Sequence, residues 1–505
     1  NQLDYIWHGM HFPQALPGRQ SFLYIFMLLV MGFATIRKWK GTRCCHIIIA
    51  VLAALTLMVL SGYYGDELVT EYMAVVITML FILVYGILLL LLKIAPKKMR
   101  IALREAAFCV AIAELAVNMA VTGLGVPSRV AYTDKQGYYE DLLQQAKEDN
   151  GNDGFYRVED SGRKTKNDDS LYGYRSATIF SSLMNLDVSH LFQSLYMEGG
   201  KNFYCYNGAS PLPSAMFSVK YMLSSNPVDE SPLRTLVGSS NGNYLYRNNY
   251  CLPLGYMMSE KAIKGWESSM LDRIGSLNSL AKQLGAKGDM LYPATCTQSQ
   301  AAGDTTIDIS EDGYYYADYV ACNADSLTVS KDDGWTQQYG KTTHRYLLDL
   351  GECKAGTKIH ITNLNAETIE YHVYRLNFKA MCTAYETLSE QTMTLEKMTD
   401  RKIVGSIDVG QAERLILSVP ADEGWTLYVD GKKTKIKPFA DALIGVHLKE
   451  GTHKIELRYT TPGVQIGAAI SVAAILLFLF SMWIRYKTRG KHGEKMHQYR
   501  RTDVQ

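Results

Sequence analysis

Residues 467–484 read GAAISVAAILLFLFSMWI, an apolar run with no charged side chain. An α-helix needs about 20 such residues to cross the roughly 30 Å of hydrocarbon in a bilayer. Helices in soluble cores rarely contain apolar runs of this length. We therefore predict a membrane-spanning helix over residues 464–484, and this helix decides the class of the protein.

Four more apolar runs lie in the first quarter of the chain, and they predict four transmembrane helices within residues 21–121. The runs cover residues 21–36, 47–61, 73–92 and 106–121. The 505 residues are 47% hydrophobic and 20% charged, which fits a hybrid of membrane helices and a soluble region. The net charge of +2 is too small to indicate a nucleic-acid partner.

Basic residues flank alternate ends of these runs. Lys and Arg gather in residues 37–43, 93–100 and 485–501, whereas the loop 62–72 has acidic residues and neither Lys nor Arg. Because basic flanks face the cytoplasm, we place the basic tail 485–505 inside and the interfacial segment 1–20 outside. Residues 122–463 also lie outside. The sequence thus predicts a multi-pass cell-membrane protein with a large extracytoplasmic domain and a C-terminal anchor helix.

The outer region is long enough for two or three domains. We expect a mixed α/β domain over residues 122–258, followed by a helical linker over residues 259–300. The expected helices are 134–149, 187–197 and 259–284, and the expected strands are 155–159, 215–223 and 244–247.

From residue 301 short strands alternate with turns in which acidic residues precede a glycine and an aromatic, as in Asp332-Asp333-Gly334-Trp335. We expect a positive φ at these glycines and core packing for Trp335 and Trp425. Residues 354–361 (KAGTKIHI) resemble residues 449–457 (KEGTHKIEL), with one residue inserted. This repeat predicts two related β-sandwiches, over residues 301–400 and 401–463. The expected fold class is a membrane all-α block plus extracytoplasmic α/β and β-sandwich domains.

Motifs for soluble catalysis are weak. Residues 238–242 (GSSNG) have the spacing of a hydrolase nucleophile, but a strand-like segment follows where a helix is required, so we predict a hairpin turn. Residues 308–319 begin like a calcium loop but place Tyr319 where a bidentate Glu is needed. No metal site is predicted, and any cofactor is unknown. All cysteines except Cys44, Cys45 and Cys109 lie in the outer region, where disulfides and free thiols both remain open.

Two polar residues, Glu114 and Asn118, share one face of the fourth predicted span. A carboxylate in a membrane costs about 2.5–3.5 kcal/mol on insertion scales, so it should face protein or water. In one interpretation, Glu114 lines a substrate cavity. In the other, it joins two helices by a hydrogen bond, and its partner lies on a helix upstream of this chain.

The outer segment before the first span contains His8, His11 and Arg19. These cationic and imidazole side chains at headgroup level suit a lipid phosphate, although interfacial anchoring also explains Arg19. Because the chain begins at Asn1 with no signal-peptide pattern, we expect it to be the C-terminal portion of a longer polypeptide.

The chain resembles the bacterial YfhO family of membrane proteins. The matching stretches follow the family's order along nearly the whole chain: Trp7-His8-Gly9, Leu16-Pro17-Gly18-Arg19, Glu114-Leu115-Ala116-Val117-Asn118, Phe155-Tyr156-Arg157-Val158-Glu159, Ser218-Val219-Lys220-Tyr221, Leu252-Pro253-Leu254-Gly255-Tyr256 and Leu417-Ser418-Val419-Pro420. Gln14 stands where the family usually has Asn. The resemblance implies a GT-C-like enzyme that takes a sugar from a polyprenyl-phosphate carrier to an envelope polymer such as lipoteichoic acid. Its catalytic carboxylate would lie in an outer loop upstream, so no catalytic residue is carried over.

Two hypotheses follow. In the first, the chain is the acceptor-side part of such a glycosyltransferase, with His8, His11 and Arg19 near the lipid phosphate and Glu114 and Asn118 in the membrane cavity. In the second, the chain is a non-catalytic, membrane-anchored carbohydrate-binding or envelope-assembly protein. In both, the lipid bilayer is a partner.

Overall fold

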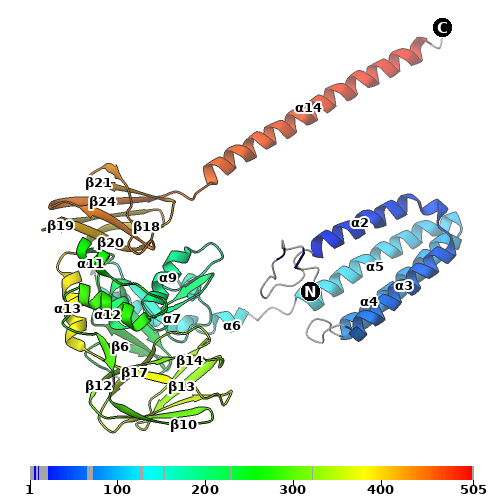
Figure 1. The fold of residues 1–505 in the computed structure, drawn as a ribbon. Coiled ribbons are helices and arrows are strands. Elements are labelled where there is room, and N and C mark those ends of the chain that lie inside the picture. Colours follow the sequence, from blue (N-terminus) through cyan, green and yellow to red (C-terminus); the bar gives the residue numbers. More distant parts are fainter. Residues whose placement is uncertain are drawn as a thin grey trace. The chain divides into compact units, whose positions relative to one another are not determined.

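The computed structural model describes residues 5–6, 10, 21–64, 72–123, 129–151, 154–227, 230–320 and 322–502. The chain divides into two compact units, Asn1–Tyr132 and Thr133–Gln505. Helices make up the described part of the first unit, and the second combines several β-sheets with helices (Figure 1).

Four long helices of the first unit lie where the sequence predicts them. They are α2 (Ser21–Arg37), α3 (Cys44–Tyr64), α4 (Tyr72–Ile94) and α5 (Lys97–Gly123). Helix α4 packs against both α3 and α5. Lys93, near the end of α4, donates a hydrogen bond to the backbone oxygen of Trp39 at 3.1 Å. The first two basic loops therefore meet at one end of this unit.

Three helical segments are long and apolar enough to cross a membrane: α3, α4 and the Val464–Ile484 part of α14. Helix α2 is apolar but has 17 residues, and α5 begins with several basic residues. Helix α14 spans Val464–Thr502 and so includes most of the predicted tail. Membrane-type helices are thus confirmed near both ends of the chain, while five crossings and their direction stay predictions.

The second unit begins with a four-stranded sheet in the order β1-β5-β7-β6. Strands β1 and β5 are parallel, and the other pairs are antiparallel. Helix α7 packs on β6 and β7 because Tyr139, Leu142 and Ala146 form one apolar, buried face. The bounds are α7 Gln136–Asn150, β1 Arg157–Asp160, β5 Val219–Ser224, β6 Arg234–Ser240 and β7 Asn243–Asn248.

Shorter elements lie before β1 and between β1 and β5 in the sequence. They are α6 (Arg129–Thr133), α8 (Asp168–Tyr172), β2 (Ile179–Phe180), α9 (Leu186–Ser194), β3 (Glu198–Gly199), β4 (Phe203–Cys205) and α10 (Pro211–Met216). The predicted strand over residues 215–223 is wrong at its start, where α10 ends. Prolines in the first turn of α10 preset a helical φ.

The single helix predicted over residues 259–284 is also wrong. Helix α11 (Glu260–Gly265) stops before Trp266, whose ring stacks on Phe439 with centroids 5.3 Å apart. Helix α12 (Arg273–Gln283) then starts with Asp272 as its N-cap. The expected linker contains strands as well: β9 (Leu291–Pro293) and β10 begin before residue 300.

Two five-stranded antiparallel sheets have the same topology, β10-β11-β16-β13-β14 and β18-β19-β24-β21-β22. The central strands β16 (Lys358–Asn363) and β24 (Gly451–Tyr459) contain half of the first repeat copy and most of the second. The repeat therefore marks equivalent strands. The other bounds are β10 Cys296–Ala301, β11 Asp304–Ile309, β13 Ser326–Lys331, β14 Thr336–Gly340, β18 Thr394–Thr399, β19 Lys402–Val409, β21 Trp425–Val429 and β22 Lys432–Thr434.

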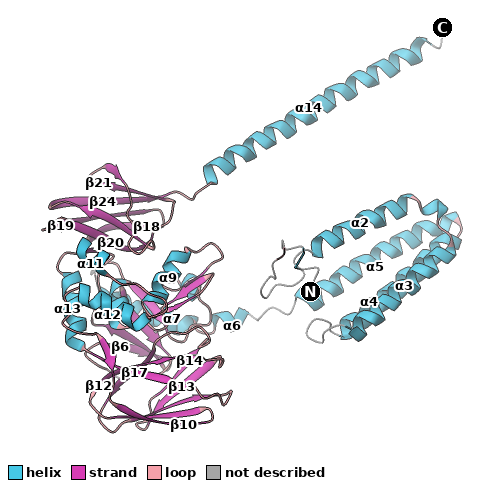
Figure 2. Ribbon diagram, viewed as in Figure 1, coloured by secondary structure: helices cyan, strands magenta, loops and turns pink. Residues whose placement is uncertain are grey.

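Each large sheet shares a hydrophobic core with a smaller sheet, β15-β12-β17-β9 in the first repeat and β23-β20-β8 in the second. Strand β8 (Gly255–Met258) precedes both repeats, yet it pairs with β20. The second repeat thus takes a strand from outside residues 401–463. The remaining strands are β12 Gly313–Tyr319, β15 Leu348–Cys353, β17 Tyr371–Leu376, β20 Glu413–Pro420 and β23 Leu443–Leu448. Helix α13 (Phe378–Ser389) connects the repeats (Figure 2), and it packs with α12 and β8.

The predicted turns are present, with one correction. Asn241 and Gly242 join β6 to β7 with φ of 48° and 74°, which confirms a hairpin turn. Gly334 has the expected positive φ, 93°. Gly313 and Gly424 do not. There a Cβ would lie 2.5 Å from Arg375 Nε or from the Tyr459 ring, so close packing explains those two glycines.

Candidate functional site

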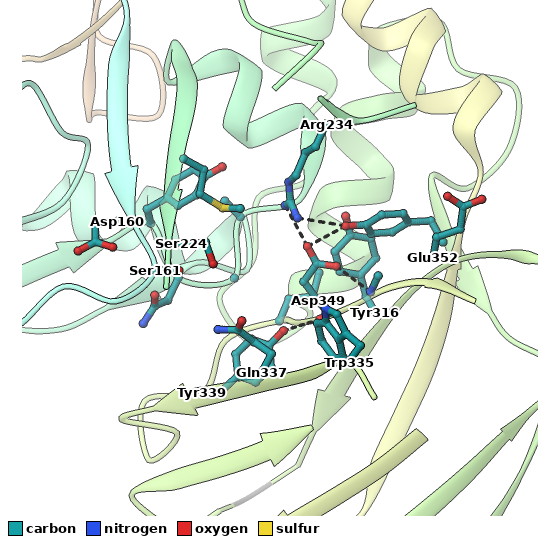
Figure 3. Close-up of a pocket in the computed structure, with 18 of the residues that line it drawn as sticks. Asp160, Ser161, Ser224, Arg234, Tyr316, Trp335, Gln337, Tyr339, Asp349 and Glu352 are labelled. Carbon is teal, nitrogen blue, oxygen red and sulfur yellow. Dashed lines mark hydrogen bonds and ion pairs between the residues drawn. The ribbon is translucent and has the colours of Figure 1, made fainter. Parts of the chain in front are cut away.

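A cavity of about 110 Å³ lies where the α/β sheet meets the first β repeat (Figure 3). Strands β1, β5 and β6 contribute residues from one side, and β12, β14 and β15 from the other. Strands β14 and β15 are the edge strands of their two sheets. Since one water needs about 10–15 Å³, the cavity has room for a ligand about the size of a hexose.

A charged pair forms the centre of the wall. An Nη2 atom of Arg234 lies 2.9 Å from Oδ2 of Asp349. The Tyr314 hydroxyl donates to the same carboxylate oxygen at 2.9 Å and accepts from Arg234 Nη1 at 3.3 Å. Burial opposes the charge on Arg234, but the neighbouring Tyr314 and Asp349 hold its pKa well above the ordinary value. The pair is therefore a fixed, charge-balanced group.

Tyr316 has a hydroxyl that lacks a partner. Its side chain is 1% exposed, and among the described cavity residues it alone has a buried side-chain oxygen without a hydrogen bond. Burial raises the pKa of Tyr316 well above its ordinary value, so the hydroxyl keeps its proton. Buried polar groups are nearly always bonded. Because the oxygen itself has almost no accessible surface, a ligand in the cavity supplies the missing partner once the lining shifts to admit it.

Aromatic and amide side chains complete this wall. Trp335 and Gln337 line the cavity beside Tyr339, whose hydroxyl donates to the backbone oxygen of Asp349. The Nζ of Lys331 lies 4.6 Å from the centre of the Trp335 ring. Apolar ring faces next to directed polar groups suit a polyhydroxylated ligand, because its C–H faces pack on rings while its hydroxyls bond to polar side chains.

The opposite wall contains Asp160, Ser161 and Ser224 (Figure 3). Asp160 accepts hydrogen bonds from the Tyr139 hydroxyl and from the backbone N–H of Gly162, the latter at 2.8 Å. Burial raises the pKa of Asp160 despite these bonds. This wall thus offers a carboxyl group and hydroxyls to a ligand.

A buried carboxylate, Glu198, lies close to Arg163, another residue of the cavity lining. Glu198 is fully buried and lies 3.8 Å from Arg163, 3.1 Å from Lys166 and 3.0 Å from His344 Nδ1. Burial disfavours its charge, but the His344 hydrogen bond and the two cations hold the pKa of Glu198 below its ordinary value. All nine cysteines are described, and none of them forms a disulfide; buried Cys205 lies beside Arg163.

The sequence-predicted site residues are only partly placed. His8, His11 and Arg19 lie outside the described residues. Glu114 in α5 accepts a hydrogen bond from the Tyr85 hydroxyl in α4 at 2.6 Å. Asn118 lies one turn further along α5. Glu114 therefore joins two helices of this chain, and it needs no partner from an upstream helix to do so.

Comparisons with known proteins decide the family. The sequence model of the family described as "Bacterial membrane protein YfhO" matches residues 1–471. This chain belongs to the YfhO family. A Bacillus subtilis (strain 168) relative named "Uncharacterized protein YfhO" is 22% identical over 374 residues, 63% of this chain and 42% of that protein. The chain thus spans less than half the length of this YfhO relative.

Two solved structures show only slight likeness to this YfhO chain. A conserved protein of unknown function from Pseudomonas aeruginosa PAO1 has 8% identity and a TM-score of 0.12, covering 33% of this chain and 84% of that one. A cupin 2 conserved barrel domain protein from Leptotrichia buccalis has 12% identity and a TM-score of 0.10, covering 33% and 89%. These TM-scores are too low to indicate a shared fold.

Several YfhO stretches meet at one buried joint. Arg157 donates to the backbone oxygens of Phe217 and Ser418, each at 2.6 Å. The hydroxyls of Ser218 and Ser418 lie 3.1 Å apart. These residues connect the β1-β5-β7-β6 sheet to β20 of the second repeat. The YfhO stretches that contain them therefore have a structural role, which is to hold these two parts together.

Sequence reasoning missed the cavity. Arg234, Tyr316 and Asp349 are distant in sequence, and no spacing rule brings them together. The Tyr314-Tyr315-Tyr316 run was an available signal, because alternation along a strand points its first and third rings to one face. Trp335 packs against the core of the first repeat, as expected, but it also lines the cavity.

Proposed function

We propose that this chain is the acceptor-side, C-terminal portion of a GT-C-like glycosyltransferase. The enzyme moves a sugar from a polyprenyl-phosphate carrier to a cell-envelope polymer of the lipoteichoic acid type. The observation that carries the proposal is the cavity beside Arg234, Asp349 and Tyr316, whose rings, balanced charges and unpartnered hydroxyl suit a saccharide. Membership of the YfhO family supports the membrane setting.

In the proposed reaction, an acceptor hydroxyl oxygen attacks the anomeric carbon of the carrier-linked sugar. The bond from that carbon to the phosphate oxygen breaks, and the lipid phosphate leaves. A carboxylate in the longer protein takes the hydroxyl proton. Within this chain, His8, His11 and Arg19 would hold the lipid phosphate, and Glu114 and Asn118 would face the substrate path.

The proposal requires the cavity to lie outside the cytoplasm. The basic loops 37–43 and 93–100 meet at one end of the membrane unit, which supports a cytoplasmic position for both. Four crossings then put residues 122–463 outside, including the two repeats, which we interpret as β-sandwiches, and the fifth crossing returns the tail to the cytoplasm.

Deletion of the full-length gene, followed by analysis of the sugars on purified envelope polymers, tests the transferase. We expect one sugar to be lost and to return with the wild-type gene. Complementation with Arg19→Ala should fail, while Arg37→Ala, at the opposite end of α2, should succeed. Unchanged polymer sugars after deletion contradict the proposal.

A second candidate is a non-catalytic, saccharide-binding envelope-assembly protein. It is favoured by one observation: the cavity belongs wholly to the Thr133–Gln505 unit. Binding of saccharides by the purified chain together with unchanged polymer sugars in the deletion strain would select this candidate. The complete chain is needed for the binding assay, because residues 301–461 alone lack β8 and β9.

A further inference from the structure

Four apolar side chains within residues 171–186 of the second unit are exposed. Leu183 is 95% exposed, and Leu171, Phe180 and Leu186 are 50%, 47% and 46% exposed. They lie on α8, β2, α9 and the loop between β2 and α9. Single exposed leucines are common on soluble surfaces, but clustered apolar side chains mark contact sites. We call these four residues the apolar patch.

One set of contacts links the patch segment to the point where the chain arrives from the membrane helices. The chain enters the second unit at Thr133, and the next residue, Asp134, pairs with Lys164. Asn167, three residues further on, exchanges two hydrogen bonds with the backbone of Phe180, at 2.8 and 3.0 Å. The ring of Tyr172 stacks on Tyr139 in α7 at 4.2 Å, which holds α8 and Leu171 beside this entry point.

A second set of contacts links the patch segment to the residues that lead into α14. Asn185, two residues after Leu183, donates to the backbone oxygen of Ala421 at 3.1 Å. The turn that follows Ala421 is bonded to the last residues before α14, because the N–H of Thr460 donates to Gly424 O at 2.9 Å. Val464 is four residues later, at most about 14 Å along the chain. A continuous series of contacts therefore joins both attachment points through the patch.

We propose that the apolar patch inserts into the lipid surface from which α14 enters the bilayer. Two attachment points linked to this segment keep it near the membrane, and lipid is the partner that suits exposed Leu and Phe side chains there. Insertion would hold the second unit in one orientation above the membrane. The inference depends on the membrane position of α14 and is independent of saccharide binding.

Photo-crosslinking tests the proposal on the complete chain. Leu183→benzoylphenylalanine and the control Leu364→benzoylphenylalanine are reconstituted in nanodiscs of phosphatidylglycerol and phosphatidylethanolamine. Leu364 is 94% exposed, and its loop bonds to Asn323 within the first repeat. After irradiation, mass spectrometry measures the fraction of chain that carries a lipid adduct.

We expect about tenfold more lipid adduct at position 183 than at position 364, since transfer of one large apolar side chain out of water gives an enrichment of at least this order. Both substitutions replace exposed side chains, so folding is preserved. Equal lipid yields at the two positions overturn the proposal. A crosslink from position 183 to another protein segment or to a second chain also overturns it.

Discussion

The unpartnered hydroxyl of Tyr316 gives the sharpest test of the cavity, through the substitution Tyr316→Phe. If a saccharide supplies the missing hydrogen bond, removing the hydroxyl costs the complex about 0.5–1.5 kcal/mol, the net value of a neutral bond. This corresponds to roughly 2- to 12-fold weaker binding. The free protein, in contrast, loses no bond, because the hydroxyl has none. Its stability should be unchanged or higher, by up to about 1–3 kcal/mol of relieved desolvation.

Tyr256→Phe is the matched control. The Tyr256 hydroxyl is also buried without a partner, yet Tyr256 does not line the cavity. Calorimetric titration of both variants with glucose, galactose, N-acetylglucosamine and lipoteichoic acid fragments measures affinity, and thermal unfolding measures stability. We expect Tyr316→Phe alone to weaken binding and neither variant to lower the unfolding temperature. Destabilisation by Tyr316→Phe, or equal affinities for all three proteins, refutes the reasoning.

Three further predictions concern the frame of the site. Arg157→Met should lower the free energy of unfolding by about 2–5 kcal/mol, because two buried carbonyls lose their hydrogen-bond donor. Urea titration checks this, with the exposed substitution Arg458→Met as the control. Equal effects of the two substitutions would contradict a stabilising role for the buried joint at Arg157. Gly255→Ala should cost about 1–3 kcal/mol, since the new Cβ would lie 2.8 Å from Leu417 Cδ2; the same titration against Gly410→Ala, where the nearest atom is 3.8 Å away, should show no comparable loss. Because the pKa of Glu198 is lowered in the folded protein, its charge stabilises the fold at pH values above the unfolded pKa of about 4.5, and this stabilisation falls as the pH drops below that value. Between pH 7 and pH 3 the free energy of unfolding should therefore decline less for Glu198→Gln than for the wild type. Parallel pH dependences of the two proteins would contradict this prediction.

Apolar length and basic flanks predict the membrane helices because each span is decided by its own residues. The same holds for the hairpin at Asn241-Gly242 and for the repeat that marks β16 and β24. Errors arise where distant contacts decide. Helix α11 ends where Trp266 stacks on Phe439, a residue far away in the sequence. Strand β8 pairs with β20, which lies more than a hundred residues later in the chain. The cavity belongs to this second kind, because Arg234 and Asp349 come from different sheets. Its shape follows from tertiary packing, which local patterns do not encode.

The central claim is that the cavity meets envelope sugars outside the cytoplasm, and a reporter placed after Gly340, at the end of β14, tests it most directly. We predict that an alkaline phosphatase fusion at this position is active in cells, while a green fluorescent protein fusion exported by the same route is dark. If the green fluorescent protein fusion is fluorescent and the phosphatase fusion is inactive, the cavity lies in the cytoplasm, away from any polymer on the cell surface.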